Sequence, residues 1–344
     1  MATVYKTLLN DDIVTTRTLL HESIPITGSI LSGTYDDRNI QTFTHGRFQS
    51  VYDYAWTSSS ANHIFDLSVG YSSRSALNGT TEALQESSKN QMYNQLSQIL
   101  VGHDVTGSIL EFDQDGDILA GGTKLRECVF LTFSRLLVKD EIKKSSVELQ
   151  LVTGSYTDPF ADSELLVVSD YGAEEEYRSN SPAGEYGILY TGSAAVEGTG
   201  VGLVFYQAGV VALTASLFEN PDFHLSGTLV QNVSQAITGS SVDDFSTEIR
   251  RRVKNIQFNN TVELNSTIYF CRLNHNEFNY SSNPTYLSSS QIRVKKQPTD
   301  SPVSYVTTVG LYSSDNELLA TAKLSEPLKK TPENEMILRV RLDY

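Results

Sequence analysis

The sequence predicts a mainly β protein of the α+β class, built from antiparallel sheets with about two amphipathic helices. Ser, Thr and Gly are abundant in the 344 residues, and 18 Tyr and 14 Phe accompany a single Trp. Aromatic and β-branched residues favour strands, while Gly and Ser favour the turns between them. Short runs of period two recur along the chain, and only two segments carry the 3.6-residue period of a helix.

The N-terminal domain is expected to span residues 1–155 as a mixed α/β domain with an extended arm at 1–35. IFDLSVGY at 64–71 alternates in the manner of a half-buried strand. One face of that strand holds Phe65, Leu67, Val69 and Tyr71, and the other holds Ile64, Asp66, Ser68 and Gly70. The alternation therefore predicts a strand with one buried face and one solvent-exposed face.

The segment 81–100, TEALQESSKNQMYNQLSQIL, predicts the first helix, and Gly102 suits its C-terminal stop. Its apolar side chains gather near one face: Leu84, Met92, Leu96, Ile99 and Leu100. Farther along, Asp-Gly within EFDQDGDIL at 111–119 predicts a hairpin. Strands are expected at 127–138 and 146–152, with a charged connection or a short helical turn at 139–144 between them.

The C-terminal domain is expected to span residues 156–344 as a β-rich domain. Its boundary is placed where 153–186 turns rich in Gly, Ser, Asp and Glu, which predicts a long insertion loop. Residues 201–218 predict a hairpin that turns at Ala208-Gly209 and is covered on both faces.

The second helix is expected at 243–258, with an apolar stripe of Phe245, Ile249, Val253 and Ile256. A basic run, Arg250, Arg251, Arg252 and Lys254, lies late in this segment. Positive charge there suits the helix dipole, and we expect these side chains on a solvated face. Docking of an acidic partner is the alternative.

From residue 261 to the end, strand follows strand, which predicts a sandwich-like C-terminal module. In the segment 336–344 the side chains of Met336, Leu338, Val340, Leu342 and Tyr344 face one way, and Ile337, Arg339, Arg341 and Asp343 face the other. The segments 318–324 and 336–344 are expected to be neighbouring antiparallel strands. LYSSDNELL between residues 311 and 319 predicts a hairpin turn.

Charge excludes nucleic-acid binding as the main function. The chain has 26 Lys and Arg against 41 Asp and Glu, a net charge of −15 with a pI of about 4.8. An acidic surface repels phosphate backbones and anionic leaflets alike. The longest apolar stretch, 201–218, is interrupted by polar residues and too short to span a bilayer. The first residues show no signal peptide, so we expect synthesis in a cytoplasm.

The sequence assigns no catalytic, cofactor-binding or metal-binding residue. Cys128 and Cys271 each lie in an apolar run and are expected to be free thiols. No phosphate loop, nucleophile elbow or zinc spacing of His and Cys occurs. These observations favour a protein that is not an enzyme and needs no cofactor.

Two groups of residues nevertheless have the chemistry of a site. Asp113, Asp115 and Asp117 alternate as in a calcium loop, but Ile118 stands where such loops need Gly and Lys124 where they need Glu. A hairpin turn is therefore favoured. An aromatic and polar group could line a sugar-binding cleft, although such clusters are more often cores. That group is Tyr52, Tyr54, Trp56, His63 and Asp66.

Several stretches resemble virion structural proteins of large contractile-tailed bacteriophages, notably marine T4-like ones. In the last third these are CRLNHNEFNYSSNPTYLSSSQIRVK, PVSYVTTVGLYSSDNELLATAKLSEPLKK and MILRVRLDY. Nearer the start, HESIPITGSILSGTY, FQSVYDYAWTSSSANHIFDLSVGYS and TFSRLLVKDEIKK are similar to the N-terminal part of one such protein. The resemblance covers most of the chain and is weakest at 153–260.

The resemblance implies a non-enzymatic virion subunit, most readily of the tail or baseplate, that acts through permanent protein–protein interfaces. Its expected partners are other virion proteins and copies of itself, without membrane, sequence-specific nucleic acid or small-molecule substrate. A neck or capsid-decoration protein is the first alternative. A carbohydrate-binding or receptor-binding module is the second, and it rests on the cluster around Trp56.

Overall fold

The computed structural model describes residues 5–26, 37–79, 83–118, 121–159, 165–192, 194–196, 198–281, 287–288, 291–292, 297 and 299–344. The helices are α1 (Ala83–Leu100), α2 (Arg135–Val138), α3 (Ala173–Glu176), α4 (Val233–Gly239) and α5 (Val242–Arg252), with 3₁₀ turns at Asn10–Asp12, Asp37–Asn39 and Ala215–Phe218. The strands up to β12 are β1 (Ile13–Ile26), β2 (Ile40–Thr42), β3 (Gln49–Tyr52), β4 (His63–Tyr71), β5 (Phe112–Asp113), β6 (Lys124–Leu125), β7 (Glu127–Phe133), β8 (Glu141–Ile142), β9 (Glu148–Val152), β10 (Leu165–Ser169), β11 (Arg178–Ser181) and β12 (Gly184–Thr191). The later strands are β13 (Gly202–Phe205), β14 (Val210–Thr214), β15 (His224–Ser226), β16 (Leu229–Gln231), β17 (Val253–Leu273), β18 (Leu287–Ser288), β19 (Gln291–Ile292), β20 (Ser304–Tyr312), β21 (Leu318–Lys330) and β22 (Met336–Asp343).

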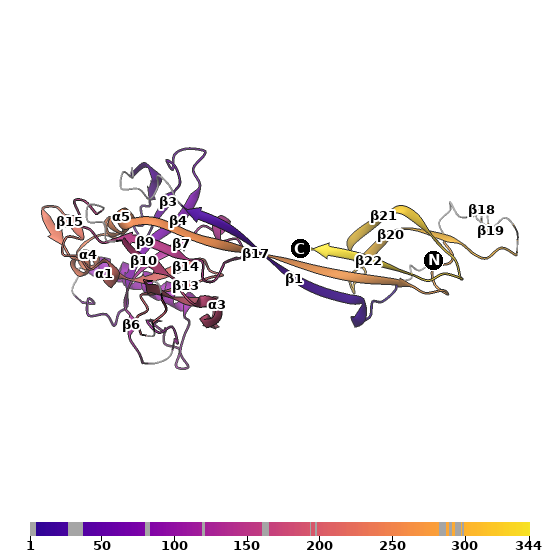
Figure 1. Cartoon of the computed structure of the whole chain (residues 1–344), viewed down its shortest axis with the longest axis horizontal. Coiled ribbons are helices and arrows are strands. Elements are labelled where there is room, and N and C mark those ends of the chain that lie inside the picture. Colours follow the sequence, from indigo (N-terminus) through magenta and orange to yellow (C-terminus); the bar gives the residue numbers. More distant parts are fainter. Residues whose placement is uncertain are drawn as a thin grey trace. The chain divides into compact units, whose positions relative to one another are not determined.

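Antiparallel sheets dominate, which confirms the predicted fold class (Figure 1). The strands β12, β13, β14, β7, β4 and β3 pair antiparallel in that order. The predicted hairpin at 201–218 is β13 and β14, both of which are buried. None of the helices in the described part of the chain combines the length and apolar character that crossing a membrane requires.

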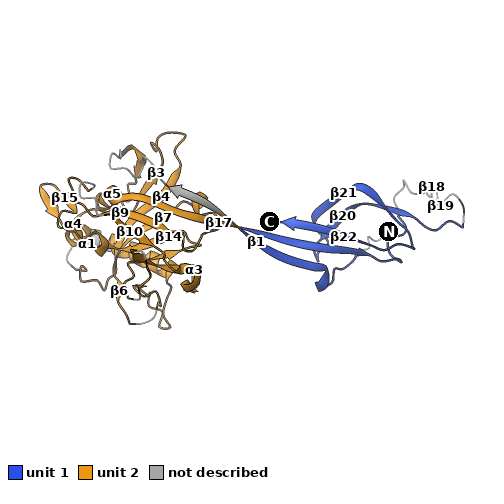
Figure 2. Cartoon of the chain, viewed as in Figure 1, with its two compact units in different colours: residues 1–19, 263–344 blue, residues 20–262 orange. Residues whose placement is uncertain are grey.

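The chain divides into two compact units (Figure 2). Unit 1 comprises 1–19 and 263–344, and unit 2 comprises 20–262. This differs from the expected boundary at 155/156. That position lies between β9 and β10, which pair directly over Leu151↔Leu166 and its neighbours. The acidic stretch after residue 153 therefore contributes β10, α3, β11 and β12 to unit 2, instead of forming one long loop.

Unit 2 is built around a sheet in the order β17-β9-β10-β12-β13-β14-β7-β4-β3-β2. Its two apolar cores draw on strands from Val51 to Phe258. Val69 and Leu131 of the central strands are fully buried, as are Leu203 and Val211. Burial of these side chains supplies the main favourable free energy of folding for the unit.

Helix α1 lies directly on β4 and covers the face of that strand that was expected to be exposed. The approach is closest at Gly70, where an added Cβ would lie 2.8 Å from the carbonyl oxygen of Lys89 and 2.8 Å from the amide nitrogen of Tyr93. Ser68, on the same face, is also buried. The prediction of a strand at 64–71 is confirmed, but its exposed face was predicted wrongly.

The buried face of α1 also differs from the expected one. Ile99 is 64% exposed, Met92 and Leu96 are half-buried, and the Leu84 side chain lies outside the described residues. The side chains that α1 buries are Lys89, Tyr93, Ser97 and Leu100. The Lys89 ammonium donates to the carbonyl oxygens of Ile237 and Ser240 at the end of α4, so its charge is satisfied inside the unit.

Helix α5 ends at Arg252, and β17 begins at Val253. The expected helix at 243–258 is therefore too long, because its last residues pair with β9 as a strand. The predicted apolar stripe is confirmed, since Phe245, Ile249, Val253 and Ile256 are all buried. At the N-terminus, the Ser241 hydroxyl accepts the Asp244 amide as a helix cap.

Unit 1 contains a three-stranded arrangement of β1, β17 and β22, and a hairpin of β20 and β21. The expected arm at the N-terminus is represented by β1, which lies next to β17. The predicted strands at 318–324 and 336–344 are confirmed within β21 and β22. However, β21 pairs with β20 and β22 pairs with β17, so the expected pairing of 318–324 with 336–344 is wrong.

Candidate functional site

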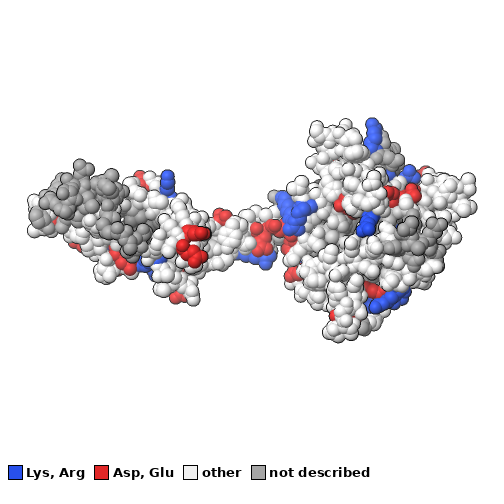
Figure 3. Space-filling view, turned by 180° about the vertical axis from the view of Figure 1, so that it is seen from behind, with Lys and Arg blue, Asp and Glu red and all other residues white. Residues whose placement is uncertain are grey.

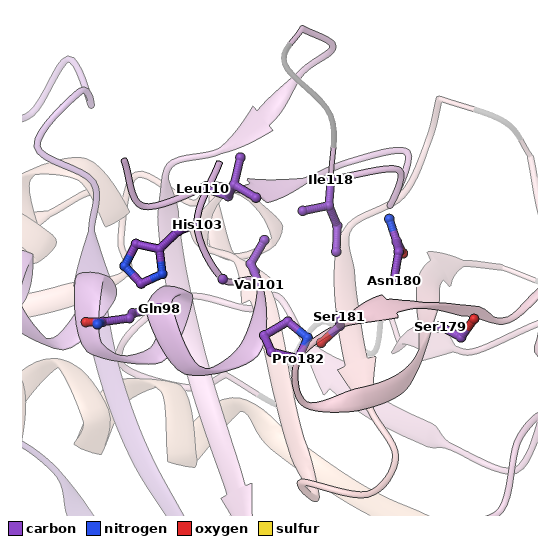
Figure 4. A pocket seen from close by; sticks show the side chains of 10 residues that line it. Gln98, Val101, His103, Leu110, Ile118, Ser179, Asn180, Ser181 and Pro182 are labelled. Atoms are coloured by element: carbon purple, nitrogen blue, oxygen red, sulfur yellow. The ribbon is translucent and has the colours of Figure 1, made fainter. Parts of the chain in front are cut away.

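Unit 2 contains several pockets, among them one of about 730 Å³ whose lining includes Asp115, Asp117 and Arg178. One cavity of about 550 Å³ lies beyond the end of α1 (Figure 4), and His103 is the titratable side chain among the residues that line it. Ser181 donates its hydroxyl to the Leu100 carbonyl, and Asn180 donates to the Asp117 carbonyl 2.9 Å away. These polar groups join the chain segments around the cavity and leave His103 without an acid or base partner among the lining residues.

The three aspartates of the predicted hairpin converge. Ligand atoms of Asp113, Asp115 and Asp117 lie within 4.8 Å of one another, which is the one such group of three in the described residues. Asp113 is fully buried, and burial raises the pKa of its carboxyl. The Lys124 ammonium contacts Asp113 Oδ2, so a lysine occupies the position where a calcium loop brings its Glu. β5 pairs with β6 here, which confirms the hairpin.

The aromatic group around Trp56 is only partly assembled. His63 Nε2 lies 2.8 Å from Asp66 Oδ1, and the Tyr52 ring lies 5.5 Å from the His63 ring. Tyr54 and Trp56 are exposed, on the connection between β3 and β4, so they are not the core residues that such clusters more often are. The structure thus brings Tyr52, His63 and Asp66 together and leaves two free aromatic rings at the surface.

The basic run of α5 is a correction to the sequence analysis, because Arg250 and Arg252 are buried rather than solvated. Arg252 donates to the carbonyl oxygens of Gly154 and Phe223, and its guanidinium lies 4.9 Å from the centre of the Phe223 ring. Glu248, one turn earlier on α5, is also buried, and burial raises the pKa of its carboxyl to about 7. In the sequence, the i, i+4 spacing of Glu248 and Arg252 could have indicated that the two side chains lie on one face of the helix as a polar pair.

The two cysteines are free, as expected, with Cys128 buried and Cys271 half-buried. Burial raises the pKa of both thiols, which keeps them protonated and unreactive at neutral pH. Glu174, Glu175 and Glu176 form α3 and are exposed at their side chains. Neither group assembles reactive chemistry in the described residues.

The feature that distinguishes this molecule is the surface of unit 1. Its large buried apolar side chains, within the described residues, are Leu273, Leu338 and Val340, each 8–9% exposed. Both apolar cores of the chain lie in unit 2. A unit of about one hundred residues normally buries most of its apolar surface in one core. In its described residues, unit 1 therefore has strands but no core of the kind that would normally hold them together.

Strand β1 shows this most clearly, because residues 13–21 are exposed on both faces. Ile13, Val14 and Leu19 of this strand are among the exposed large apolar side chains. On the hairpin, Tyr312, Leu318 and Leu319 are exposed as well. Exposed apolar side chains on strands that have no core within the described residues indicate an interaction surface, and unit 1 is the candidate functional site of this chain.

Comparisons with known proteins found no relative of the chain. No family model matches the sequence, no curated protein matches it, and no solved structure matches the fold.

One prediction concerns the exposed ring of Trp56. Because this side chain is 43% exposed, Trp56→Ala should lower the free energy of unfolding by about 1 kcal/mol or less, instead of the 3–5 kcal/mol that a core Trp costs. Urea denaturation followed by far-UV circular dichroism measures the change. A loss above about 3 kcal/mol would show that the ring is packed in the folded protein.

Proposed function

We propose that the chain is a non-enzymatic structural subunit of a contractile-tailed bacteriophage virion, placed in the tail or baseplate. It acts there through permanent interfaces with other virion proteins and with copies of itself. The observation that carries the proposal is unit 1, in which β1 is exposed on both faces and the described residues form no apolar core of their own. In an obligate interface, apolar side chains that are exposed in the single chain become buried against the partner, as in a domain core.

The resemblance supports the same proposal from the sequence. Its three stretches in the last third of the chain, at 271–295, 302–330 and 336–344, all belong to unit 1. The other three stretches, at 21–35, 48–72 and 132–144, belong to unit 2. The resemblance therefore supports a virion role for the chain as a whole, and the open surface of unit 1 adds the argument for assembly.

A second function is favoured by the exposed rings of Tyr54 and Trp56 in unit 2. Exposed aromatic side chains stack on sugar rings, and the His63–Asp66 pair 2.8 Å apart offers polar contacts nearby. The corresponding function is recognition of a carbohydrate receptor on the host surface. It predicts that the chain binds host surface glycan and that Trp56→Ala abolishes this binding with the fold intact.

Immunogold electron microscopy of intact particles tests the main proposal, with an antibody against this chain and the phage that encodes it. We expect label along the tail or at its tip. Label on the head or collar would overturn the tail placement in favour of a neck or decoration protein. Absence of label from every particle, with the denatured virion also negative on a blot, would overturn a structural role in the virion.

A further inference from the structure

One face of the three-stranded sheet of unit 1 carries exposed and half-buried apolar side chains between arginines. In the register of β17 with β22, Phe270 lies opposite Arg339 and Arg272 opposite Ile337, so these side chains share a face. Arg17 of β1 pairs with Glu263 of β17 on the opposite face, so alternation along both strands places Val14 on the face of Phe270. We call it the open face and define it by Val14, Leu264, Ile268, Phe270 and Ile337.

The exposure of the open face contrasts with that of the opposite face. Ile337 is 57% exposed and Val14 is 41% exposed, while Ile268 and Phe270 are half-buried. On the opposite face Leu338 and Val340 are buried. Apolar residues continue to alternate along these strands although their side chains on this face are exposed. Such a pattern indicates that another surface covers the face when the protein assembles.

Charge indicates what covers it. Unit 1 contains eleven Lys and Arg and eleven Asp and Glu, whereas unit 2 contains fifteen against thirty. Unit 1 is therefore neutral, and unit 2 carries the whole net charge of −15. Side chains of both signs occur on unit 1 in the view of Figure 3. Two copies of unit 1 can approach without net repulsion, while copies of unit 2 repel each other.

The register places three arginines on the open face. Arg272 pairs with Asp12, and Arg341 Nε lies 2.7 Å from Asp343 Oδ1, whereas Arg339 has no acidic partner among the described residues. A partner chosen by opposite charge, such as an acidic protein or a nucleic acid, would find one free arginine on this face. A face whose charges are mostly paired within the chain instead fits another neutral face.

The edges of the sheet point to the same partner. In the described residues, β22 has β17 as its partner strand, and β1 likewise lies at the end of the strand order. Open edges present unpaired backbone groups that recruit strands, most readily those of an identical chain.

We infer that the open face of unit 1 packs against unit 1 of a further copy of this chain, so that the protein is a homo-oligomer whose copies complete each other's cores. The inference deepens the proposed function by naming the partner of the same surface. It predicts that association needs no other virion protein.

Size-exclusion chromatography with light scattering on the purified full chain tests this. We expect a mass that is a multiple of 38.0 kDa at micromolar concentration. The double variant Val14→Asp/Ile337→Asp introduces two carboxylates on each copy at the interface, and it should weaken association about tenfold or more, which leaves mainly monomer. Both side chains are exposed in the single chain, so the fold of each copy should be retained, as circular dichroism can verify.

The matched control is Leu136→Asp, an equally drastic change at a side chain of unit 2 that is 84% exposed. It should leave the oligomer intact. Wild-type chain that stays monomeric would overturn self-association, and so would an oligomer that survives the double variant. If the purified chain is monomeric and the antibody still labels intact particles, the proposed function stands and the partner is a different virion protein. In that case self-association fails while the virion role does not.

Discussion

Gly70→Ala is expected to destabilise unit 2 by about 3 kcal/mol. The new methyl group would lie 2.8 Å from the Lys89 carbonyl oxygen and from the Tyr93 amide nitrogen, both of which are backbone atoms of α1. Backbone cannot rotate away as a flexible side chain can, so the helix must move off β4. That shift would disturb the buried Lys89 ammonium and the Tyr93 hydroxyl, which donates to the Leu125 carbonyl 2.8 Å away.

Gly239→Ala is the control for the same chemical change. Gly239 is the last residue of α4, and an added Cβ there would meet nothing closer than the Gln231 amide atoms at 3.7 Å. This substitution should change the free energy of unfolding by less than about 1 kcal/mol, in the stabilising direction. Urea denaturation monitored by fluorescence of Trp56, the single Trp of the chain and part of unit 2, measures both variants. Equal stabilities for the two would contradict the close approach of α1 to β4.

The same contact explains how far the sequence could predict this region. Alternation along 64–71 and helical period along 81–100 were sufficient to predict the strand and the helix, because each pattern is local. The packing of one on the other was not predictable from them. It depends on Gly70 offering space for a backbone and on Lys89 finding carbonyl partners in α4, and both are relations between distant parts of the chain.

The division into units could not be read from composition for a related reason. The acidic stretch after residue 153 looks like a linker, yet Leu166 and Val168 pair with β9 and continue the sheet. The true division falls inside β1 and β17, at Leu19 and Val262, where the alternation of each strand continues without any change of period. A boundary within a continuous strand leaves no turn or linker signal in the sequence.

The open face of unit 1 could not be recognised from the sequence either. Ile268 and Phe270 look like ordinary strand residues, and alternation along 336–344 places Ile337 with Arg339 and Arg341, away from Leu338. Only the register of β17 with β22 shows that they share a face opposite to the buried Leu338 and Val340. An unfilled core is a property of the fold, so it becomes visible when the burial of every strand is known.

Arg252→Met is expected to cost about 2–4 kcal/mol of unfolding free energy. The guanidinium donates to the carbonyl oxygens of Gly154 and Phe223. Methionine would leave the Phe223 oxygen without this donor and the Gly154 oxygen with only the Asn220 amide, 3.3 Å away. Arg251→Met is the matched control on the next residue. Its side chain is largely at the surface and contacts Glu248 at 3.4 Å, so its loss should cost about 1 kcal/mol or less. Similar losses for both variants in urea denaturation would contradict the buried role of Arg252.

The pH dependence of the Arg252→Met effect separates its two causes. Burial raises the pKa of Glu248 to about 7 in the folded protein, above its ordinary value of 4.5, so folding favours the protonated carboxyl. The contribution of Glu248 to stability therefore falls as pH rises from about 4.5 to 7 and stays low above that range. Without the nearby Arg252 charge the carboxylate is costlier still, so the loss in Arg252→Met should be larger at pH 8 than at pH 5. Adding Glu248→Gln should remove this difference and leave the loss that comes from the two carbonyl oxygens, whereas a difference that survives in the double variant would assign the pH dependence to another group.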